Sequence, residues 1–246
     1  MDVMGDTVVE NRVAELKEIF KPFDININPE KYKIEYPKNL VRKACVLIPL
    51  CVIDGEYHLI LTLRSEKLTH HAGYVAFPGG MQDETDQDNI HTALREAKEE
   101  IGLEPKDVRV IASMSPGLVK PRNIVYPVIG LVPSDFKPVI NEHEVTLVFK
   151  VPLKRFLSSE RRRVDEFTSE VQATYHVYHF IDNFEGKEVD TWGFTATLCV
   201  MTALAIYQTD QKFCFFDKFE INKDRVFPPD SVRKVLAMMM KPAAKY

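Results

Sequence analysis

The order of hydrophobic and polar residues along the chain predicts an α/β protein. Residues 44–53 and 57–63 are two apolar runs joined at Asp54-Gly55, and they predict a hairpin of largely buried strands. Shorter apolar or alternating segments predict further strands at residues 108–113, 126–132, 145–151 and 171–181.

Four other segments have the composition or spacing of helices. Residues 7–20 carry apolar side chains at helical spacing and predict an amphipathic helix that docks on the domain. Residues 194–207 are almost wholly apolar and predict a buried helix. Two shorter helices are predicted at residues 152–157 and 231–240.

These elements predict one domain with an extension at each end. A chain of 246 residues fits such an organisation and can bury a substantial core. We expect an N-terminal helical extension, packed on the domain, over residues 1–36. The domain itself is expected over residues 37–210, and a C-terminal extension over residues 211–246.

Composition and charge narrow the choice of partner. The apolar fraction of 45% and the charged fraction of 28% are those of an ordinary soluble globular protein. A net charge of −4 provides no broad basic surface, so we expect neither a nucleic acid nor a membrane as partner. An anionic small-molecule substrate must therefore meet local positive charge or a bound metal. The sequence leaves open whether the protein is a monomer or a homodimer.

The cysteines and the chain ends bear on the compartment. The four cysteines match no zinc ligand set, and we expect them to be reduced core residues. Residues 1–6 lack the plan of a signal peptide, and no apolar run is long enough to span a bilayer. Residues 244–246 are loosely similar to a peroxisomal tripeptide. We expect a cytoplasmic protein, with the peroxisome as the second location.

The stretch with the clearest chemistry is residues 77–103. It opens with a proline and two glycines, which permit backbone conformations closed to other residues. An acidic loop follows, and then a predicted helix whose apolar residues form one stripe. Glu96, Glu99 and Glu100 cluster on another face of that helix, and Gly102 follows as a natural stop.

Two interpretations of this glutamate cluster compete. Three carboxylates on one helix face repel one another, and most such clusters are simply solvated acidic surfaces. The alternative is a site for a hard cation such as Mg²⁺ or Mn²⁺, which prefers oxygen ligands. The glycine turn that leads into the helix, and Arg95 beside the acids, favour the metal site.

This stretch resembles a Nudix box, the metal-binding loop–helix–loop of hydrolases that act on nucleoside diphosphates linked to another group. Residues 95–103 fit the motif without a mismatch. The first half departs from it, because Asp86 stands where the family usually has a glutamate and the gap to Arg95 is one residue longer. The resemblance implies an α/β/α sandwich with a mixed sheet, here with helical additions at both termini.

The upstream sequence is similar to one branch of that family, the coenzyme A diphosphatases. Residues 61–68, then Gly73 and residues 77–80, carry this similarity together with the longer box. The branch commonly has a basic residue where Thr69 stands, which is a mismatch. The resemblance implies hydrolysis of the pyrophosphate of coenzyme A or its thioesters, with Mg²⁺ or Mn²⁺ as cofactor. The products are 3′,5′-adenosine bisphosphate and 4′-phosphopantetheine.

The resemblance also implies roles for individual residues. Glu96, Glu99 and Glu100 are expected to bind the metal, Glu99 being also catalytic, while Arg95 steadies the glutamates. The residues expected to contact the substrate are Arg64, Ser65, Lys67, Gly79 and Gly80. Arg64 ends an apolar strand and opens the loop that leads to the box, where a guanidinium can clamp a phosphate.

Outside the box, several assignments stay open. Glu142 and Glu144 are candidates for a distal ligand or general base, and Glu144 is preferred; the alternative for both is a solvated loop acid. Trp192 either stacks on adenine or packs in the core. His143, His176 and His179 are expected to be structural.

Rival functions remain as well. One is a Nudix hydrolase of a nucleotide sugar, a dinucleotide or capped RNA, and another is a non-catalytic nucleotide-binding Nudix domain. The presence of all three box glutamates speaks against the second rival.

Overall fold

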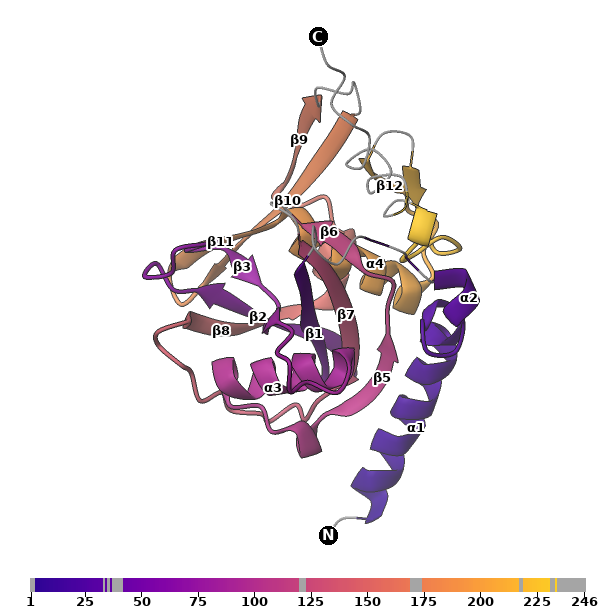
Figure 1. The fold of residues 1–246 in the computed structure, drawn as a ribbon, viewed down its shortest axis with the longest axis vertical. Coiled ribbons are helices and arrows are strands. Elements are labelled where there is room, and N and C mark those ends of the chain that lie inside the picture. Colours follow the sequence, from indigo (N-terminus) through magenta and orange to yellow (C-terminus); the bar gives the residue numbers. More distant parts are fainter. Residues whose placement is uncertain are drawn as a thin grey trace.

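The computed structural model describes residues 3–32, 34, 36, 42–119, 123–168, 174–216, 219–230 and 233. Within these residues the chain forms two β-sheets and the helices that cover them (Figure 1). No helix among them is both long and apolar enough to cross a membrane.

The first sheet is mixed and has eight strands within the described residues. Its strands are β1 (Arg42–Ile53), β2 (Glu56–Arg64), β3 (Val75–Ala76), β4 (Gly79–Met81), β5 (Arg109–Ser113), β6 (Gly117–Val119), β7 (Asn123–Leu131) and β8 (Val145–Pro152). β1 and β7 run parallel at its centre, and the other pairs are antiparallel. The predicted hairpin is confirmed, because Asp54 and Gly55 take the left-handed conformations that a tight two-residue turn needs.

The central strands are apolar throughout because both faces of the sheet are covered. Along β1, Cys45, Leu47 and Cys51 face the cluster that contains helix α3 (Asn89–Ile101). Ile48 and Leu50 face the opposite cluster, which contains helices α1 (Val3–Phe20) and α4 (Gly193–Tyr207). Successive side chains of a strand point to opposite faces, so a strand buried on both faces has no polar alternation. The sheet with helices on its two faces is the predicted α/β/α sandwich.

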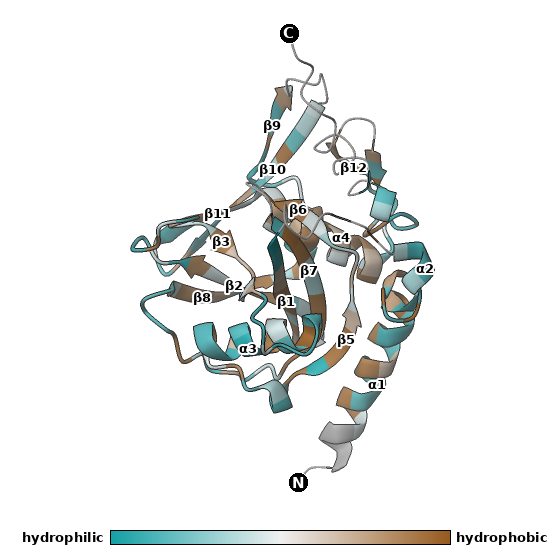
Figure 2. Cartoon of the chain, in the orientation of Figure 1, coloured by the Kyte–Doolittle hydropathy of each residue, from teal (hydrophilic) through white to brown (hydrophobic). Residues whose placement is uncertain are grey.

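The two large helices on the second face match their predicted segments. α1 buries Val13, Leu16 and Phe20 against the core, as its spacing predicts. α4 is apolar over almost its whole length in Figure 2 and is buried between the first sheet and the strands that precede it. Buried free thiols at Cys45, Cys51 and Cys199 agree with the predicted reduced core cysteines.

The second sheet was largely missed by the sequence pattern. Its strands are β9 (Arg162–Thr168), β10 (Thr174–Phe184), β11 (Lys187–Trp192), β12 (Phe213–Phe216) and β13 (Phe219–Ile221). Only β10 was expected, as the alternating segment 171–181. β9 and β10 form the long projecting hairpin in Figure 1. Short turns of helix complete the chain at Lys21–Phe23 (η1), Pro29–Tyr32 (α2), Pro105–Asp107 (η2) and Leu153–Leu157 (η3).

The C-terminal extension differs in part from the expected helical addition. Its described residues begin with β12 and β13, which pair with each other and join β10. Their aromatic side chains pack against those of β10, as in the contact of Phe216 with Tyr175, and this stabilises strands rather than a helix. Pro229, Asp230 and Arg233 are helical, and the rest of the predicted helix 231–240 lies outside the described residues.

Candidate functional site

Helix α3 presents the acidic residues because its two ends and its apolar face are fixed. At its start, the Asp88 carboxylate accepts a hydrogen bond from the backbone N–H of His91 at 2.7 Å. At its end, Gly102 takes a left-handed conformation, and its N–H donates to the carbonyl of Lys98 at 3.0 Å. Ala97 and Ile101 are buried against the first sheet. Glu96 and Glu100 lie beside this apolar face, next to the glycines of strand β4, and Glu99 is exposed.

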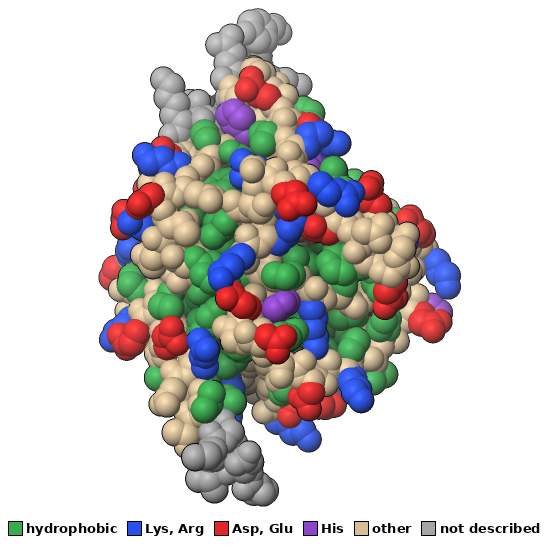
Figure 3. All heavy atoms as spheres, turned by 180° about the vertical axis from the view of Figure 1, so that it is seen from behind, with side chains coloured by type: hydrophobic (Ala, Val, Ile, Leu, Met, Phe, Trp, Pro, Cys, Tyr) green, Lys and Arg blue, Asp and Glu red, His purple; other side chains and the backbone are tan. Residues whose placement is uncertain are grey.

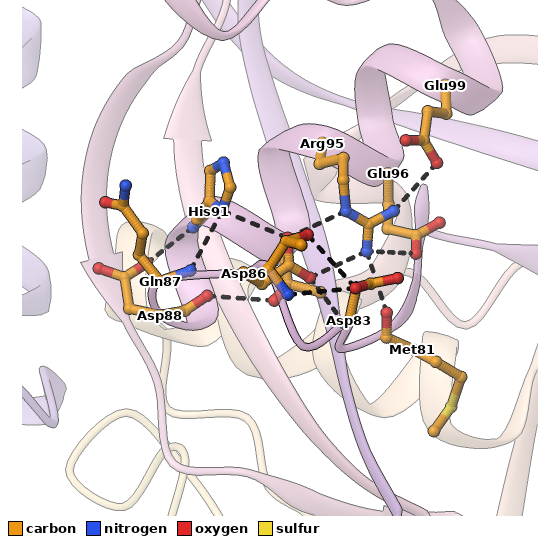
Figure 4. A network of polar contacts seen from close by, with 11 residues as sticks. Met81, Asp83, Asp86, Gln87, Asp88, His91, Arg95, Glu96 and Glu99 are labelled. Atoms are coloured by element: carbon orange, nitrogen blue, oxygen red, sulfur yellow. Dashed lines mark hydrogen bonds and ion pairs between the residues drawn. The ribbon is translucent and has the colours of Figure 1, made fainter.

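Arg95 is the centre of a polar network that joins the loop before helix α3 to the first turns of that helix (Figure 4). Its Nε and Nη2 donate to the two carboxylate oxygens of Asp86 at 3.0 and 2.9 Å. The same guanidinium reaches Glu96 Oε1 at 2.9 Å and Glu99 Oε2 at 3.0 Å. It also donates to the carbonyl oxygen of Met81 at 3.0 Å. Arg95 therefore ties the loop after β4 to two of the predicted metal ligands.

Asp86 is a member of this site that was noted only as a departure from the family motif. Its side chain is fully buried, and its hydrogen bonds with Arg95 hold the pKa of the Asp86 carboxyl well below the usual range. The only indication of this role in the sequence was the position of Asp86, nine residues before Arg95. The two-pronged contact with a guanidinium became visible only in the structure.

Glu100 lies on the buried side of the acidic cluster, with 2% of its side chain exposed. Its Oε2 accepts a hydrogen bond from the backbone N–H of Gly79 at 3.1 Å, and its Oε1 lies 3.4 Å from Arg64 Nη1. Burial raises the pKa of Glu100 to about 8, although Arg64 and the Gly79 N–H act in the opposite direction. A further positive charge at this position would therefore stabilise the ionised form.

The two glycines of the turn make room for different groups. A Cβ on Gly80 would lie 2.5 Å from the carboxylate carbon of Glu96. A Cβ on Gly79 would lie 2.4 Å from the backbone carbonyl oxygen of Cys45. Gly80 thus lets the Glu96 carboxylate approach the backbone, while Gly79 lets strand β4 pack against β1.

Glu96 and Glu144 are electrostatically connected to the rest of the cluster. Burial raises the pKa of Glu96, and repulsion by Glu99 and Glu144 adds to this effect. Glu144 is half-buried and accepts a hydrogen bond from the Asn141 side chain at 3.0 Å. Glu142 is exposed in the same turn. The structure thus brings Glu144, rather than Glu142, to the acidic cluster.

The loop between β2 and β3 supplies the other predicted residues. The Arg64 N–H donates to the Tyr74 carbonyl at 2.9 Å, and Gly73 N–H donates to the Arg64 carbonyl at 3.2 Å, which closes the loop. Ser65 is buried, and its N–H donates to the Glu144 carbonyl at 2.9 Å. Lys67 is exposed on the loop, and its backbone N–H donates to the Ser65 hydroxyl at 3.3 Å.

The carboxylates of Glu96, Glu99 and Glu100 are oxygen ligands of the kind that a divalent cation takes. In this structure each of them contacts an arginine. In this conformation, no three acidic, histidine or cysteine side chains of the described residues are grouped as they would be around one metal ion. Arg95 holds Glu96 and Glu99, and Arg64 holds Glu100. Burial raises the pKa values of Glu96 and Glu100 by more than the neighbouring arginines lower them, so a bound cation would stabilise the ionised carboxylates. Oxygen ligands in such a site suit Mg²⁺ or Mn²⁺.

A mixed sheet between helices, with a glycine turn leading into an acidic, arginine-braced helix, defines the architecture expected of a Nudix domain. The comparison with protein families agrees, because the NUDIX domain family matches residues 42–171. The chain therefore belongs to the Nudix family.

Three curated relatives show the degree of similarity. The chain is 40% identical over 192 residues to "Nudix hydrolase 15, mitochondrial" of Arabidopsis thaliana, covering 76% of this chain and 64% of that protein. It is 39% identical over 178 residues to "Nudix hydrolase 22, chloroplastic" of the same plant, covering 70% and 58%. These alignments span less than two thirds of either plant protein. The chain is also 37% identical over 172 residues to "Peroxisomal coenzyme A diphosphatase NUDT7" of Mus musculus, covering 70% and 73%.

Proposed function

We propose that this protein hydrolyses the pyrophosphate bond of coenzyme A or its thioesters, with Mg²⁺ or Mn²⁺ as cofactor. Water adds to one phosphorus, the anhydride bond breaks, and two phosphate monoesters leave. These are 3′,5′-adenosine bisphosphate and 4′-phosphopantetheine, acylated where a thioester is cut. The observation that carries the proposal is the complete acidic helix beside Arg64, together with the 37% identity to a protein named a coenzyme A diphosphatase.

The metal would be held by Glu96, Glu99 and Glu100. A divalent ion bound there offsets the negative charge of the phosphates and can activate a water molecule. The raised pKa values of Glu96 and Glu100 support this assignment, because burial disfavours both charged carboxylates and a bound cation would offset that cost. Glu99 has 53% of its side chain exposed, so it can turn from Arg95 toward an ion without a loss of core packing.

The chain's own groups would position the reactants. Arg95 keeps the glutamates in place through its anchor on Asp86, and Arg64 contacts a phosphate from the other side of the cluster. The Arg64 side chain keeps 22% of its surface exposed, which leaves part of it accessible for such a contact. Gly79 and Gly80 contact the substrate through the backbone, and Ser65 and Lys67 contact it from the loop.

Glu144 is the proposed general base or distal ligand. Its carboxylate lies close enough to Glu96 and Glu100 to raise the pKa values of both. A water molecule between these groups could pass its proton to Glu144 or to Glu99 during attack on phosphorus.

A second candidate is hydrolysis of another nucleoside diphosphate derivative, such as a nucleotide sugar, a dinucleotide or capped RNA. The family resemblance at the metal site supports this second candidate as much as the first. The two candidates differ in what the loop between β2 and β3 would bind. The net charge of −4 speaks against a large nucleic acid. Figure 3 agrees for one face of the molecule, where acidic and basic side chains are interspersed.

The location is proposed to be the cytoplasm, with the peroxisome second. The relatives named above carry the words mitochondrial, chloroplastic and peroxisomal, which concern those proteins. Imaging of the full chain with a tag at either end distinguishes the two locations. A mitochondrial pattern would contradict both.

A substrate panel tests the proposed function. Purified protein with Mg²⁺, and separately with Mn²⁺, is incubated with coenzyme A, acetyl-coenzyme A, ADP-ribose, a diadenosine polyphosphate and capped RNA. We expect the highest kcat/KM for coenzyme A or its thioester, with the two predicted products in equal amounts. Cleavage of ADP-ribose or the dinucleotide alone would support the second candidate. A nucleotide-binding protein that cleaves none of them would point to the non-catalytic alternative.

A further inference from the structure

An aromatic cluster lies where the first sheet meets the second, beside the loop that carries Arg64. The rings of Tyr74 and Trp192 meet edge to face, with centroids 5.0 Å apart. The His179 ring stacks on Trp192 at 5.7 Å with an interplanar angle of 9°. The His71 ring lies 5.5 Å from that of Tyr74. These four residues form a continuous run of rings from the interior to the surface.

The inner half of this run is rigid. β10 and β11 pair so that His179 lies opposite Trp192. His179 is buried, and its Nδ1 lies 2.7 Å from Asp190 Oδ2, while its Nε2 lies 3.4 Å from Asp165 Oδ2. One face of Trp192 is therefore covered by a histidine that lies between two aspartate side chains. Of the two roles left open by the sequence, this environment favours packing for Trp192.

The outer half of the run is exposed but fixed at its backbone. Tyr74 has 41% of its surface exposed, whereas the next residue, Val75, is buried. Its carbonyl accepts the Arg64 N–H at 2.9 Å, and its own N–H donates to the His71 carbonyl at 3.2 Å. The next residue, Val75, pairs with Leu63 and accepts a hydrogen bond from the Thr195 hydroxyl at 3.1 Å. The backbone of Tyr74 is thus fixed by hydrogen bonds, while its side chain stays partly exposed to solvent.

Tyr74 is the backbone neighbour of Arg64, the cationic residue proposed to hold phosphate. Arg64 hydrogen-bonds the Tyr74 backbone on one side and reaches Glu100 with its side chain on the other. Burial and the positive charge of Arg64 together lower the pKa of the His71 imidazole. A ligand that contacts Arg64 through a phosphate can therefore bring an attached group toward Tyr74.

We propose that Tyr74 is the stacking surface for the adenine base of the substrate, with Trp192 and His179 as its support. This inference rests on the proposed function in taking a nucleoside diphosphate as the substrate class. Adenine has a flat π-face and is joined to its phosphates through a ribose, so it matches an exposed ring beside an arginine. The pantetheine arm is aliphatic and has no ring to stack.

The test compares the binding of two fragments by Tyr74→Ala, Tyr74→Phe and wild-type protein. ADP and 4′-phosphopantetheine are titrated calorimetrically into each protein in the presence of Mg²⁺. We expect Tyr74→Ala to bind ADP about tenfold more weakly, and Tyr74→Phe to bind it within about twofold of wild type, because stacking requires the ring and not the hydroxyl. Binding of 4′-phosphopantetheine should be the same in all three.

Several outcomes would overturn the inference. It fails if Tyr74→Ala binds ADP as wild type does, or if wild type does not bind ADP. A loss that affects both fragments equally would show that the substitution displaces Arg64 and that Tyr74 has only a structural role. Failure of the proposed function is seen separately, as wild-type protein that binds ADP but does not cleave coenzyme A.

Discussion

The substitution Glu100→Gln tests the electrostatics of the site in the metal-free protein. Glu100 is the most deeply buried of the three box glutamates, and burial raises its pKa from 4.5 to about 8. Glutamine keeps the shape and can still accept the hydrogen bond from Gly79, but it carries no titrating proton. The two proteins should therefore differ in how their stability depends on pH.

The sign follows from proton linkage. The folded protein binds the Glu100 proton more tightly than the unfolded chain does, so this group's contribution to stability is complete below pH 4.5. The contribution is lost as the pH rises from 4.5 to about 8. The loss amounts to about 4–5 kcal/mol, taking about 1.4 kcal/mol for each pH unit in this range. Wild type should therefore become less stable than Glu100→Gln as the pH rises.

Chemical denaturation at pH 5, 6, 7 and 8, with a chelator present, measures this difference. Glu104→Gln is the matched control, because 44% of the Glu104 side chain is exposed and its carboxylate pairs with Lys98 at the surface. Addition of Mg²⁺ at pH 8 should then stabilise wild type more than Glu100→Gln. A stability difference between the two proteins that stays constant from pH 5 to 8 would refute the reasoning.

Four further predictions follow from contacts at the same site. Gly80→Ala should bind Mg²⁺ about tenfold more weakly by calorimetry while remaining folded, because its Cβ meets only the movable end of Glu96. Gly79→Ala should lose roughly 1–3 kcal/mol of stability, because its Cβ meets backbone; equal stability of the two variants would contradict this. Asp86→Asn should lower the free energy of unfolding by roughly 2–3 kcal/mol near neutral pH, measured by urea denaturation. The difference from wild type should shrink below pH 3.8, and an unchanged stability would mean that the buried ion pair contributes nothing. Arg64→Lys should raise KM for the substrate several-fold with little change in unfolding midpoint, because lysine lacks the two-pronged fork; an unchanged KM would remove Arg64 from the site.

The parts of the fold that could be predicted are those with strong local patterns. Local sequence alone predicts the apolar strands β1 and β2, the turn at Asp54-Gly55 between them, and the apolar helix α4. The stripe of α3 likewise predicted which face the glutamates occupy. In each case burial follows directly from the order of residues.

The second sheet could not be predicted in this way. Strand β9 has the sequence RRVDEFT, whose charged residues do not indicate a buried face. Strands β12 and β13 are short and gain stability from long-range pairing with β10. Pairing partners distant in sequence leave no periodic signal within the strand itself.

The candidate site shows the same division. Helical spacing predicted that the glutamates cluster on one face, and the family resemblance implied their roles and that of Arg95. This assignment stays a prediction until it is measured. The closure of the loop by Gly73 and Tyr74, and the contact of Ser65 with Glu144, depend on backbone hydrogen bonds between distant segments. Such contacts arise from the tertiary structure, which is why Tyr74 had no signal in the sequence.

The most direct test of the central claim is the rate of coenzyme A cleavage by wild type, Glu99→Gln and Glu104→Gln as Mg²⁺ is varied. We expect wild type and Glu104→Gln to release 3′,5′-adenosine bisphosphate and 4′-phosphopantetheine at the same metal-dependent rate. Glu99→Gln should be slower by roughly 100-fold or more, since it removes a charged metal ligand. Cleavage by Glu99→Gln at the wild-type rate, or none by wild type at saturating Mg²⁺, would contradict the account.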